Sequence, residues 1–325
     1  MTAHPKPLAQ TRPHSTHRLR VLIALLMAFA LPVALSGTAV ADSGRARTWT
    51  VQVGTESSDQ AIQGMSFLPK NIFVNAGDKV TWEANAAEIH TVTFLAAGQT
   101  IDSTQPFDPS NPLYVTPQGG TSYDGHSYYN SGVMTNVDDS GFTQVESYSL
   151  TFPDTGTFTY YCLVHGMAMV GTVHVRDKGT DYPFTQDQYN ARVDRAERAT
   201  LRDGYQLWQD ASDQADNHTV IAGADDGVAM VMRFIEPKVV IHVGQQVTFV
   251  NNGMGEPHTV TFGAEPANVI PPLGDPGNYT GGQLNSGILP PTAKFTVTFN
   301  KAGVYDYICA LHDYIGMVGK VVVED

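Results

Sequence analysis

Short stretches in which polar residues alternate with β-branched or aromatic residues recur along the chain, and Gly or Pro separates them. A period of two residues predicts β-strands, because successive side chains of a strand point to opposite faces. Many short strands with regular turns are typical of antiparallel β-sandwiches, so we expect an all-β fold. The clearest stretches are residues 80–82, 91–94, 157–161, 172–175, 247–249, 295–299 and 320–323.

The same order of motifs occurs twice, so the chain contains an internal repeat. His-Thr-Val-Thr-Phe begins at His90 and again at His258, and a loop with unusual side chains closes each copy. Each copy is about the size of an ordinary domain, so we predict one domain over 42–178 and another over 218–325. The two loops read Tyr-Tyr-Cys-Leu-Val-His-Gly-Met-Ala-Met-Val-Gly at 160–171 and Tyr-Ile-Cys-Ala-Leu-His-Asp-Tyr-Ile-Gly-Met-Val-Gly at 307–319.

Residues 179–217, between the two copies, differ in composition from both. Thr185 and Gln188 have the spacing of a capping box, in which each side chain binds the backbone N–H of the other residue. Apolar residues then recur on one helical face among Arg and Glu residues. We predict an amphipathic helix over 185–203 that ends near Gly204, so that a short helical linker joins the domains.

The first copy is longer than the second. His90 and Cys162 are 72 positions apart, whereas His258 and Cys309 are 51 positions apart. The excess lies within 96–146, which is rich in Pro, Gly, Asp, Ser and Tyr. Loops of this length are often functional or mobile, and we expect a surface excursion here.

The first 41 residues have the pattern of a secretory signal. Arg18 and Arg20 precede an apolar run over 21–35, and Ala-Val-Ala at 39–41 offers a cleavage site. A membrane anchor is the alternative, but the run is short for a span of about 20 residues. We therefore predict a signal peptide over 1–41, a secreted protein of the cell envelope or periplasm, and no membrane span after removal of the signal.

The charge of the chain is strongly acidic, with 19 Lys and Arg against 32 Asp and Glu. The predicted signal contains four of the basic residues and no acidic one, so the mature chain has 15 basic and 32 acidic side chains, a formal −17. Phosphate recognition needs clustered Lys and Arg, so we exclude nucleic acid as a partner. At low salt this charge favours encounter with a basic protein partner. The alternative is that the acidity only keeps a secreted protein soluble.

The chain has only two cysteines, Cys162 and Cys309, one in each repeated loop. Exported chains commonly use cysteine in disulfides, so a Cys162–Cys309 disulfide is one interpretation. It would leave unexplained the matched histidines three positions later, His165 and His312, and the methionines that follow. Metal ligation explains all of these residues together.

The type of donor indicates which metal. Two imidazoles, a thiolate and a weak axial thioether form the trigonal set that suits an electron-transfer copper. Structural zinc prefers four Cys or His ligands, and Met is a poor zinc ligand. Met169 and Met317 each stand just before Val-Gly in their loops, which favours copper. The upstream histidines lie in predicted strands, so the folded sandwich would hold them rigidly.

With these motifs both copies resemble cupredoxins, the family of plastocyanin, pseudoazurin, amicyanin and azurin. The resemblance covers about 48–176 and 218–325, which is most of the mature chain. It implies that each copy is a Greek-key β-sandwich with one type 1 copper, two ions in all. The ligands that it implies are His90, Cys162, His165 and Met169 in the first copy, and His258, Cys309, His312 and Met317 in the second.

The copies depart from the family in two respects. Three residues separate His165 from Met169, as in azurin, and Met167 is a nearby competitor for the axial position; the second loop has four intervening residues, as in plastocyanin. Thr91 and Thr259 stand where plastocyanin and azurin usually have Asn. The redox potential does not follow from these differences, because axial ligands and surrounding contacts tune it.

Three functions compete. We expect electron transfer between protein partners, with electrons passing through exposed edges of His165 or His312. Copper storage or delivery is second, although it would not need a Met-tuned site in each domain. A copper enzyme is third: resemblance to nitrite reductases and small laccases would imply further histidines, but the chain has no His-x-His pair, and Tyr161 and Ile308 precede the two cysteines. We therefore predict a carrier with no catalytic residues.

Overall fold

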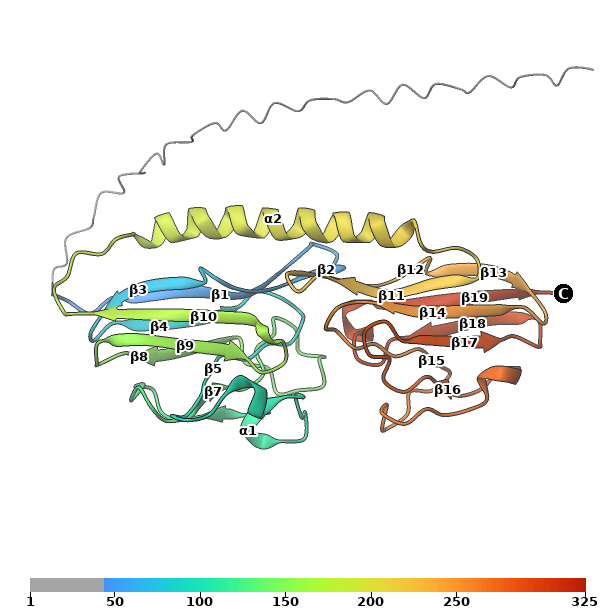
Figure 1. Ribbon diagram of the computed structural model, residues 1–325, viewed down its shortest axis with the longest axis horizontal. Helices are drawn as coiled ribbons and strands as arrows, with labels where there is room; N and C mark the ends of the chain where they lie inside the picture. The colour runs from blue at the N-terminus through green and yellow to red at the C-terminus, as the bar shows by residue number, and fades with distance from the viewer. Residues whose placement is uncertain (1–43) are drawn as a thin grey trace, which may run out of the picture. The chain divides into compact units, whose positions relative to one another are not determined.

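The computed structural model describes residues 44–325 (Figure 1). The predicted signal peptide, residues 1–41, lies outside the described residues. The described chain is mostly strand, as the alternating pattern predicts, and it forms two β-sandwiches. None of its helices is long and apolar enough to cross a membrane.

The first sandwich consists of the strands and short helices between residues 48 and 176. They are β1 (Thr48–Glu56), β2 (Ile62–Leu68), β3 (Asn71–Asn75), β4 (Lys79–Ala84), β5 (Thr93–Phe94), η1 (Ile101–Thr104), α1 (Pro112–Val115), β6 (Pro117–Gln118), β7 (Tyr129–Ser131), β8 (Ser147–Thr151), β9 (Gly156–Cys162) and β10 (Gly166–Arg176). One sheet has the order β2-β1-β4-β8, and the other has the order β3-β10-β9-β5-β7-β6. The elements from η1 to β7 belong to the predicted excursion, so that segment is partly ordered into strands.

The second sandwich repeats this arrangement between residues 219 and 324. It comprises β11 (Thr219–Asp225), β12 (Ala229–Ile235), β13 (Lys238–His242), β14 (Gln246–Asn252), β15 (Thr261–Phe262), η2 (Pro276–Asn278), β16 (Leu284–Asn285), β17 (Lys294–Thr298), β18 (Gly303–Ile308), η3 (Asp313–Ile315) and β19 (Val318–Glu324). Its sheets have the orders β12-β11-β14-β17 and β13-β19-β18-β15-β16.

The sheets are mixed rather than purely antiparallel, which corrects the expectation from the turn pattern. In the first copy β1 pairs in parallel with β4, and β3 pairs in parallel with β10. The second copy has the same two parallel pairs, β11 with β14 and β13 with β19. Parallel neighbours cannot be joined by a hairpin, so the chain must cross to the other sheet before it returns.

One sheet continues through both sandwiches. Strand β2 pairs antiparallel with β12, with Ile62 opposite Val231 and Gly64 opposite Ala229. The pairing joins four strands of each copy into one eight-stranded sheet. The repeat alone did not predict that the sheet continues from one copy to the other, because the pairing depends on backbone hydrogen bonds between strand edges.

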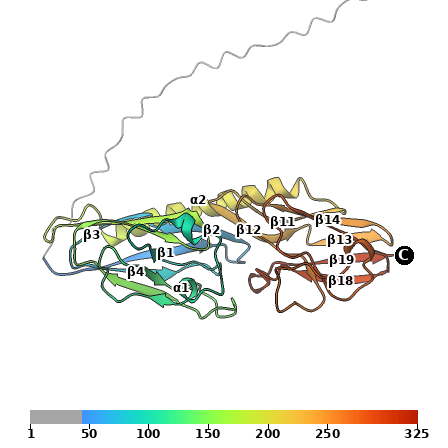
Figure 2. The same cartoon turned by 60° about the horizontal axis from the view of Figure 1, so that its bottom comes forward.

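The linker helix α2 (Gln186–Ser212) lies over the joined sheet and contacts β1, β2, β11 and β12 (Figures 1 and 2). The predicted capping box is present: the Gln188 N–H donates to Thr185 Oγ1 over 3.1 Å, and the Thr185 N–H donates to Gln188 Oε1 over 2.9 Å. The helix does not end near Gly204 as predicted but continues to Ser212. Gly204 instead permits close packing, since a Cβ there would lie 2.2 Å from Cγ2 of Ile62.

Repeat-related aromatic side chains fill the centre of each sandwich and support the strands that lead to the cysteine loops. The three side chains of each set lie edge-on or tilted to one another, a favourable arrangement of aromatic rings. All are fully buried. They are Trp82, Phe94 and Tyr160 in the first copy and Phe249, Phe262 and Tyr307 in the second.

Candidate metal centres

In the first sandwich the structure brings His90, Cys162 and His165 together. His90 precedes β5 and is held by two backbone hydrogen bonds with Met134, of 2.9 and 2.7 Å. Cys162 is the last residue of β9, and His165 lies in the turn before β10. The Nδ1 atoms of the histidines are 3.2 Å apart, and Cys162 Sγ lies 3.9 Å from Nδ1 of His90 and 3.4 Å from Nδ1 of His165.

The second sandwich repeats this geometry with His258, Cys309 and His312. The two Nδ1 atoms are again 3.2 Å apart, and Cys309 Sγ lies 3.8 Å from Nδ1 of His258 and 3.4 Å from Nδ1 of His312. Cys309 directly follows β18, so each cysteine stands at the end of an equivalent strand. Both cysteines are free and buried, which rules out the Cys162–Cys309 disulfide as a feature of this structure.

A threonine after the upstream histidine fixes each cysteine loop. The Thr91 N–H points to Cys162 Sγ at 3.4 Å, and Thr91 Oγ1 accepts a hydrogen bond from the Leu163 N–H at 2.8 Å. Thr259 makes the same pair of contacts in the second copy, at 3.3 Å to the sulfur and 2.7 Å from the Ala310 N–H. Threonine therefore holds the loop at the position where the resemblance led us to look for Asn.

A glycine lies against the other ring nitrogen of each upstream histidine. A Cβ at Gly54 would lie 2.6 Å from His90 Nε2, and one at Gly223 would lie 2.1 Å from His258 Nε2. Both glycines have positive φ, +77° and +71°. They let the backbone of β1 or β11 approach the imidazole, which leaves Nδ1 facing the cysteine.

The methionines of the loops differ in burial. Met169 and Met317 are fully buried and belong to the same apolar clusters as Cys162 and Cys309. Met167 is 65% exposed. Burial beside the cysteine favours Met169 over Met167 for the axial position, although axial coordination remains a prediction.

Burial shifts the pKa values of the first set towards neutral groups. It raises the pKa of Cys162 to about 11 and lowers the pKa of His90 well below its usual range. In the second set burial acts in the same sense, but contact between Cys309 and His312 outweighs it. That contact raises the pKa of His312 and lowers the pKa of Cys309.

The outer edges of His165 and His312 are buried, which corrects the prediction that they are exposed. Their side chains are only 2% and 4% exposed. Nε2 of His165 lies 3.7 Å from a Glu256 oxygen, and Nε2 of His312 lies 3.3 Å from Glu256 and 3.9 Å from Glu88. Each ligand loop thus faces the other copy rather than solvent.

Apolar residues of the two cysteine loops close this interface. Tyr314 and Ile315 of the second loop pack against the core of the first sandwich, together with Val164. Arg233 strengthens the contact, because its Nη1 donates to the Ile315 carbonyl over 2.6 Å and its Nη2 donates to the Asp59 carbonyl. The two copies therefore cover each other's histidine edges.

Sequence reasoning missed Glu88 and Glu256, which are 1% and 9% exposed. Burial raises the pKa of Glu88 to about 8, and the neighbouring Glu256 adds to this shift. Burial also acts to raise the pKa of Glu256, but His312 outweighs it and lowers that pKa. A signal was present in the repeat, since both copies read Glu-x-His, with the acid two positions before the upstream histidine.

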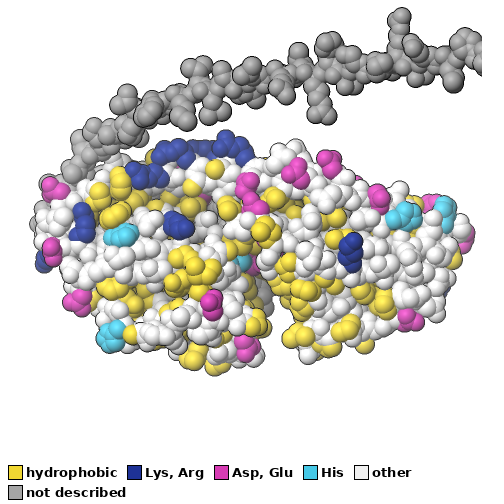
Figure 3. Space-filling model, viewed as in Figure 1, with side chains coloured by type: hydrophobic (Ala, Val, Ile, Leu, Met, Phe, Trp, Pro, Cys, Tyr) yellow, Lys and Arg dark blue, Asp and Glu magenta, His cyan; other side chains and the backbone are white. Residues whose placement is uncertain are grey.

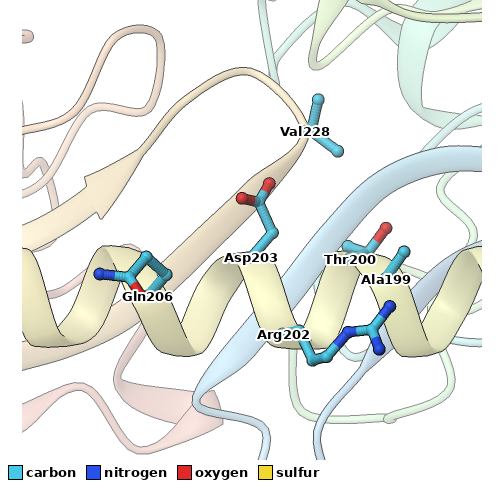
Figure 4. A pocket seen from close by; sticks show the side chains of 6 residues that line it. All are labelled: Ala199, Thr200, Arg202, Asp203, Gln206 and Val228. Atoms are coloured by element: carbon cyan, nitrogen blue, oxygen red, sulfur yellow. The ribbon is translucent and has the colours of Figure 1, made fainter. Parts of the chain in front are cut away.

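An open depression of about 450 Å³ lies elsewhere, between α2 and the turn that joins β11 to β12 (Figure 4). Arg202, Asp203 and Gln206 of the helix line it opposite Val228. It contains none of the predicted ligands and no cysteine or histidine, so we assign no chemistry to it.

The donors in the two Cys/His sets fit a copper ion. Metal bonds of about 2.0 Å to nitrogen and 2.3 Å to sulfur place neighbouring donors about 3.3–3.8 Å apart around one ion. The observed separations, 3.2–3.9 Å in the first set and 3.2–3.8 Å in the second, are close to this range. Imidazole with thiolate is a borderline-to-soft set that suits copper or zinc, and the buried thioethers favour copper.

Comparison with known proteins agrees with this chemistry. The family described as "Copper binding proteins, plastocyanin/azurin family" matches residues 52–176 and 219–324. A chloroplastic plastocyanin of Tetradesmus obliquus is 38% identical over 104 residues, which cover 31% of this chain and 63% of that protein. A plastocyanin of Solanum crispum is 32% identical over 112 residues, covering 32% of this chain and 98% of that protein. A solved copper(I) form of an amicyanin mutant aligns at 30% identity and a TM-score of 0.24, over 35% of this chain and 89% of that chain.

Proposed function

Because the chain belongs to the plastocyanin/azurin family of copper-binding proteins, we propose that it is a secreted electron carrier with one type 1 copper in each sandwich. The duplicated set of two Nδ1 atoms and one Sγ atom, at nearly identical separations in both copies, carries this proposal. Bound copper would supply one-electron exchange between Cu(II) and Cu(I). The chain would hold it through the six histidine and cysteine residues, with Met169 and Met317 as weak axial ligands.

The protein's contribution is to hold these donors still. Strand ends, the Thr91 and Thr259 hydrogen bonds and the glycine contacts fix the ligands before copper binds. A site that need not rearrange between oxidation states keeps the reorganisation cost of electron transfer low. Each cysteine is fully buried, which protects the thiolate from oxidation and from exchange.

The proposed partners are redox proteins, as for other carriers of this kind. The histidine edges are covered, so a partner would not reach the centres through them. The acidic surface favours a basic partner. Figure 3 shows Lys and Arg side chains gathered along part of the side where α2 lies. The exposed arginines of α2 are Arg192, Arg195, Arg198 and Arg202.

The experiment is a copper count and an optical spectrum of the mature protein. We expect two copper ions per chain, each with intense thiolate-to-Cu(II) absorption. Cys162→Ser should remove one ion and about half of the absorption, and Cys309→Ser should remove the other, so that each variant is the control for its counterpart. One ion per chain, or copper without blue absorption, would contradict the duplicated-site proposal.

We further propose that the protein carries electrons rather than turning over a small substrate, because both donor sets are enclosed. The copper-loaded protein should not sustain reduction of nitrite by a reduced dye or oxidation of phenols by oxygen. Turnover that disappears in both cysteine variants would favour the enzyme instead.

A further inference from the structure

Four titratable side chains meet between the two ligand loops: Glu88 and His165 from the first copy, and Glu256 and His312 from the second. The repeat relates the two acids to each other and the two histidines to each other. Glu88, Glu256 and His312 have donor atoms within 4.8 Å of one another, and His165 Nε2 is 3.7 Å from Glu256. We call these four residues the interfacial cluster.

Hydrogen bonds within the described chain do not satisfy the interfacial cluster. His165 Nε2 and Glu88 Oε2 are buried and have no hydrogen-bond partner there. The contacts of 3.7 Å at His165 and 3.9 Å at Glu88 are longer than a hydrogen bond. Polar atoms buried in this way are costly unless a further group binds them.

The nitrogen-to-oxygen separations in the cluster are similar to the donor separations in the two copper sets. Its nitrogen-to-oxygen contacts are 3.3, 3.7 and 3.9 Å. The proposed copper donors are 3.2–3.9 Å apart in the first sandwich and 3.2–3.8 Å apart in the second. Bonds of about 2.0–2.2 Å from a tetrahedral ion to nitrogen or oxygen would place these donors about 3.3–3.6 Å apart.

We propose that the interfacial cluster binds a third metal ion, a divalent zinc or copper, between the two sandwiches. The proposal rests on the proposed function, since His165 and His312 would offer Nδ1 to the type 1 coppers and Nε2 to the third ion. Imidazole nitrogen and carboxylate oxygen suit zinc and copper(II), and the absence of a thiolate from the set means that the third ion would not be blue. Binding would release to solvent the Nε2 protons and any proton on Glu88.

Charge also favours a cation at this position. Glu88 and Glu256 are two largely buried carboxylates with oxygen atoms within 4.8 Å of each other, and no Lys or Arg of the described chain forms an ion pair with either. A divalent ion there would neutralise both carboxylates and would contact residues of both copies. It would also link the two ligand loops through one ion, so the interface would become part of the metal-binding function.

The test loads the mature chain with copper until the blue absorption is constant, then adds zinc and removes unbound metal. We expect two blue coppers and one further ion per chain by elemental analysis. The double variant Glu88→Gln with Glu256→Gln should keep the blue absorption and bind the further ion at least tenfold more weakly. The control is Glu83→Gln with Glu324→Gln, which removes one exposed acid from each copy and should retain it.

A total of two ions per chain after zinc addition would overturn the third site and leave the carboxylates as hydrogen-bond acceptors for Nε2–H. Retention of the third ion by the double variant would overturn it too. If the double variant loses its blue copper, anomalous diffraction at the zinc edge from the unsubstituted protein decides: a peak among the four side chains supports the site, and no peak there refutes it. Failure of the proposed function is separate, because it would appear as missing blue absorption before zinc is added.

Discussion

Replacing Gly223 with alanine tests whether the second donor set depends on close approach of β11 to His258. A Cβ at this position would lie 2.1 Å from His258 Nε2, whereas ordinary contacts begin at 3.4 Å. The imidazole would have to retreat by about 1 Å, several times the ~0.2 Å within which metal–ligand distances hold. Because Gly223 has φ of +71°, alanine also costs about 1–2 kcal/mol of backbone strain.

The two effects can be separated. Gly227, in the turn that follows β11, has φ of +86° and nothing within 4 Å of a built Cβ. Gly227→Ala should therefore lower the free energy of unfolding by a similar backbone term and leave copper binding unchanged. Gly223→Ala should in addition weaken copper binding at the second site by about 10–100-fold, the usual cost of disturbing a contact that orients a ligand.

The assay is competition for copper between the protein and a chelator, with the blue absorption as the readout of bound copper. A Cys162→Ser background leaves only the second site. Thermal unfolding of the metal-free forms measures the strain separately. Equal copper affinity in the Gly223→Ala and Gly227→Ala proteins would show that His258 has room to move, and the account of how this ligand is fixed would be wrong.

Two further predictions follow from burial and hydrogen bonding. Met169→Leu should shift the potential and spectrum of the first site while copper still binds, whereas Met167→Leu should change neither, since Met167 is exposed. Potentiometry in a Cys309→Ser background measures the first site alone. A larger shift from Met167→Leu would make Met167 the axial ligand instead. Asp78→Ala should lower the free energy of unfolding by about 3 kcal/mol or more, because the buried carboxylate accepts four hydrogen bonds. The donors are the backbone N–H groups of Arg47 and Asn75, Trp49 Nε1 and the Tyr182 hydroxyl. Replacement of the exposed Asp154 with alanine should change the free energy of unfolding little, and similar denaturant midpoints for the two variants would contradict this prediction.

The repeat and its donors could be found in the sequence because they are local or periodic features. Alternation predicts strands, and a matched Cys-x-x-His in each copy names two donors of each set. His90 and His258 could be named because the repeat places them equivalently, and the structure brings both to their cysteines. The capping box fixed the start of α2 for the same reason: both partners lie within four residues.

What could not be predicted depends on contacts between the copies. The pairing of β2 with β12 uses backbone groups and has no side-chain signature. Gly204 suggested a helix end from composition, but its role is to fit against Ile62, a residue distant in sequence. Glu88 and Glu256 were visible as a repeated Glu-x-His, yet only the folded interface shows that both acids reach the same histidines.

The interface between the copies determines whether a partner can reach the histidine edges. In a single copy the edge of His165 or His312 would face solvent and could meet a partner. Here β2–β12 pairing, α2 and Arg233 hold each edge against the other copy, and the cost is the burial of two carboxylates. Buried charges are tolerated only when they are compensated, so the two carboxylates would destabilise the fold without positive charge on both sides. Copper in each proposed site would supply part of that charge, and an ion in the interfacial cluster would supply the rest. Metal loading and domain docking should therefore be coupled, and neither sandwich should bind copper with its full affinity when it is separated from the other.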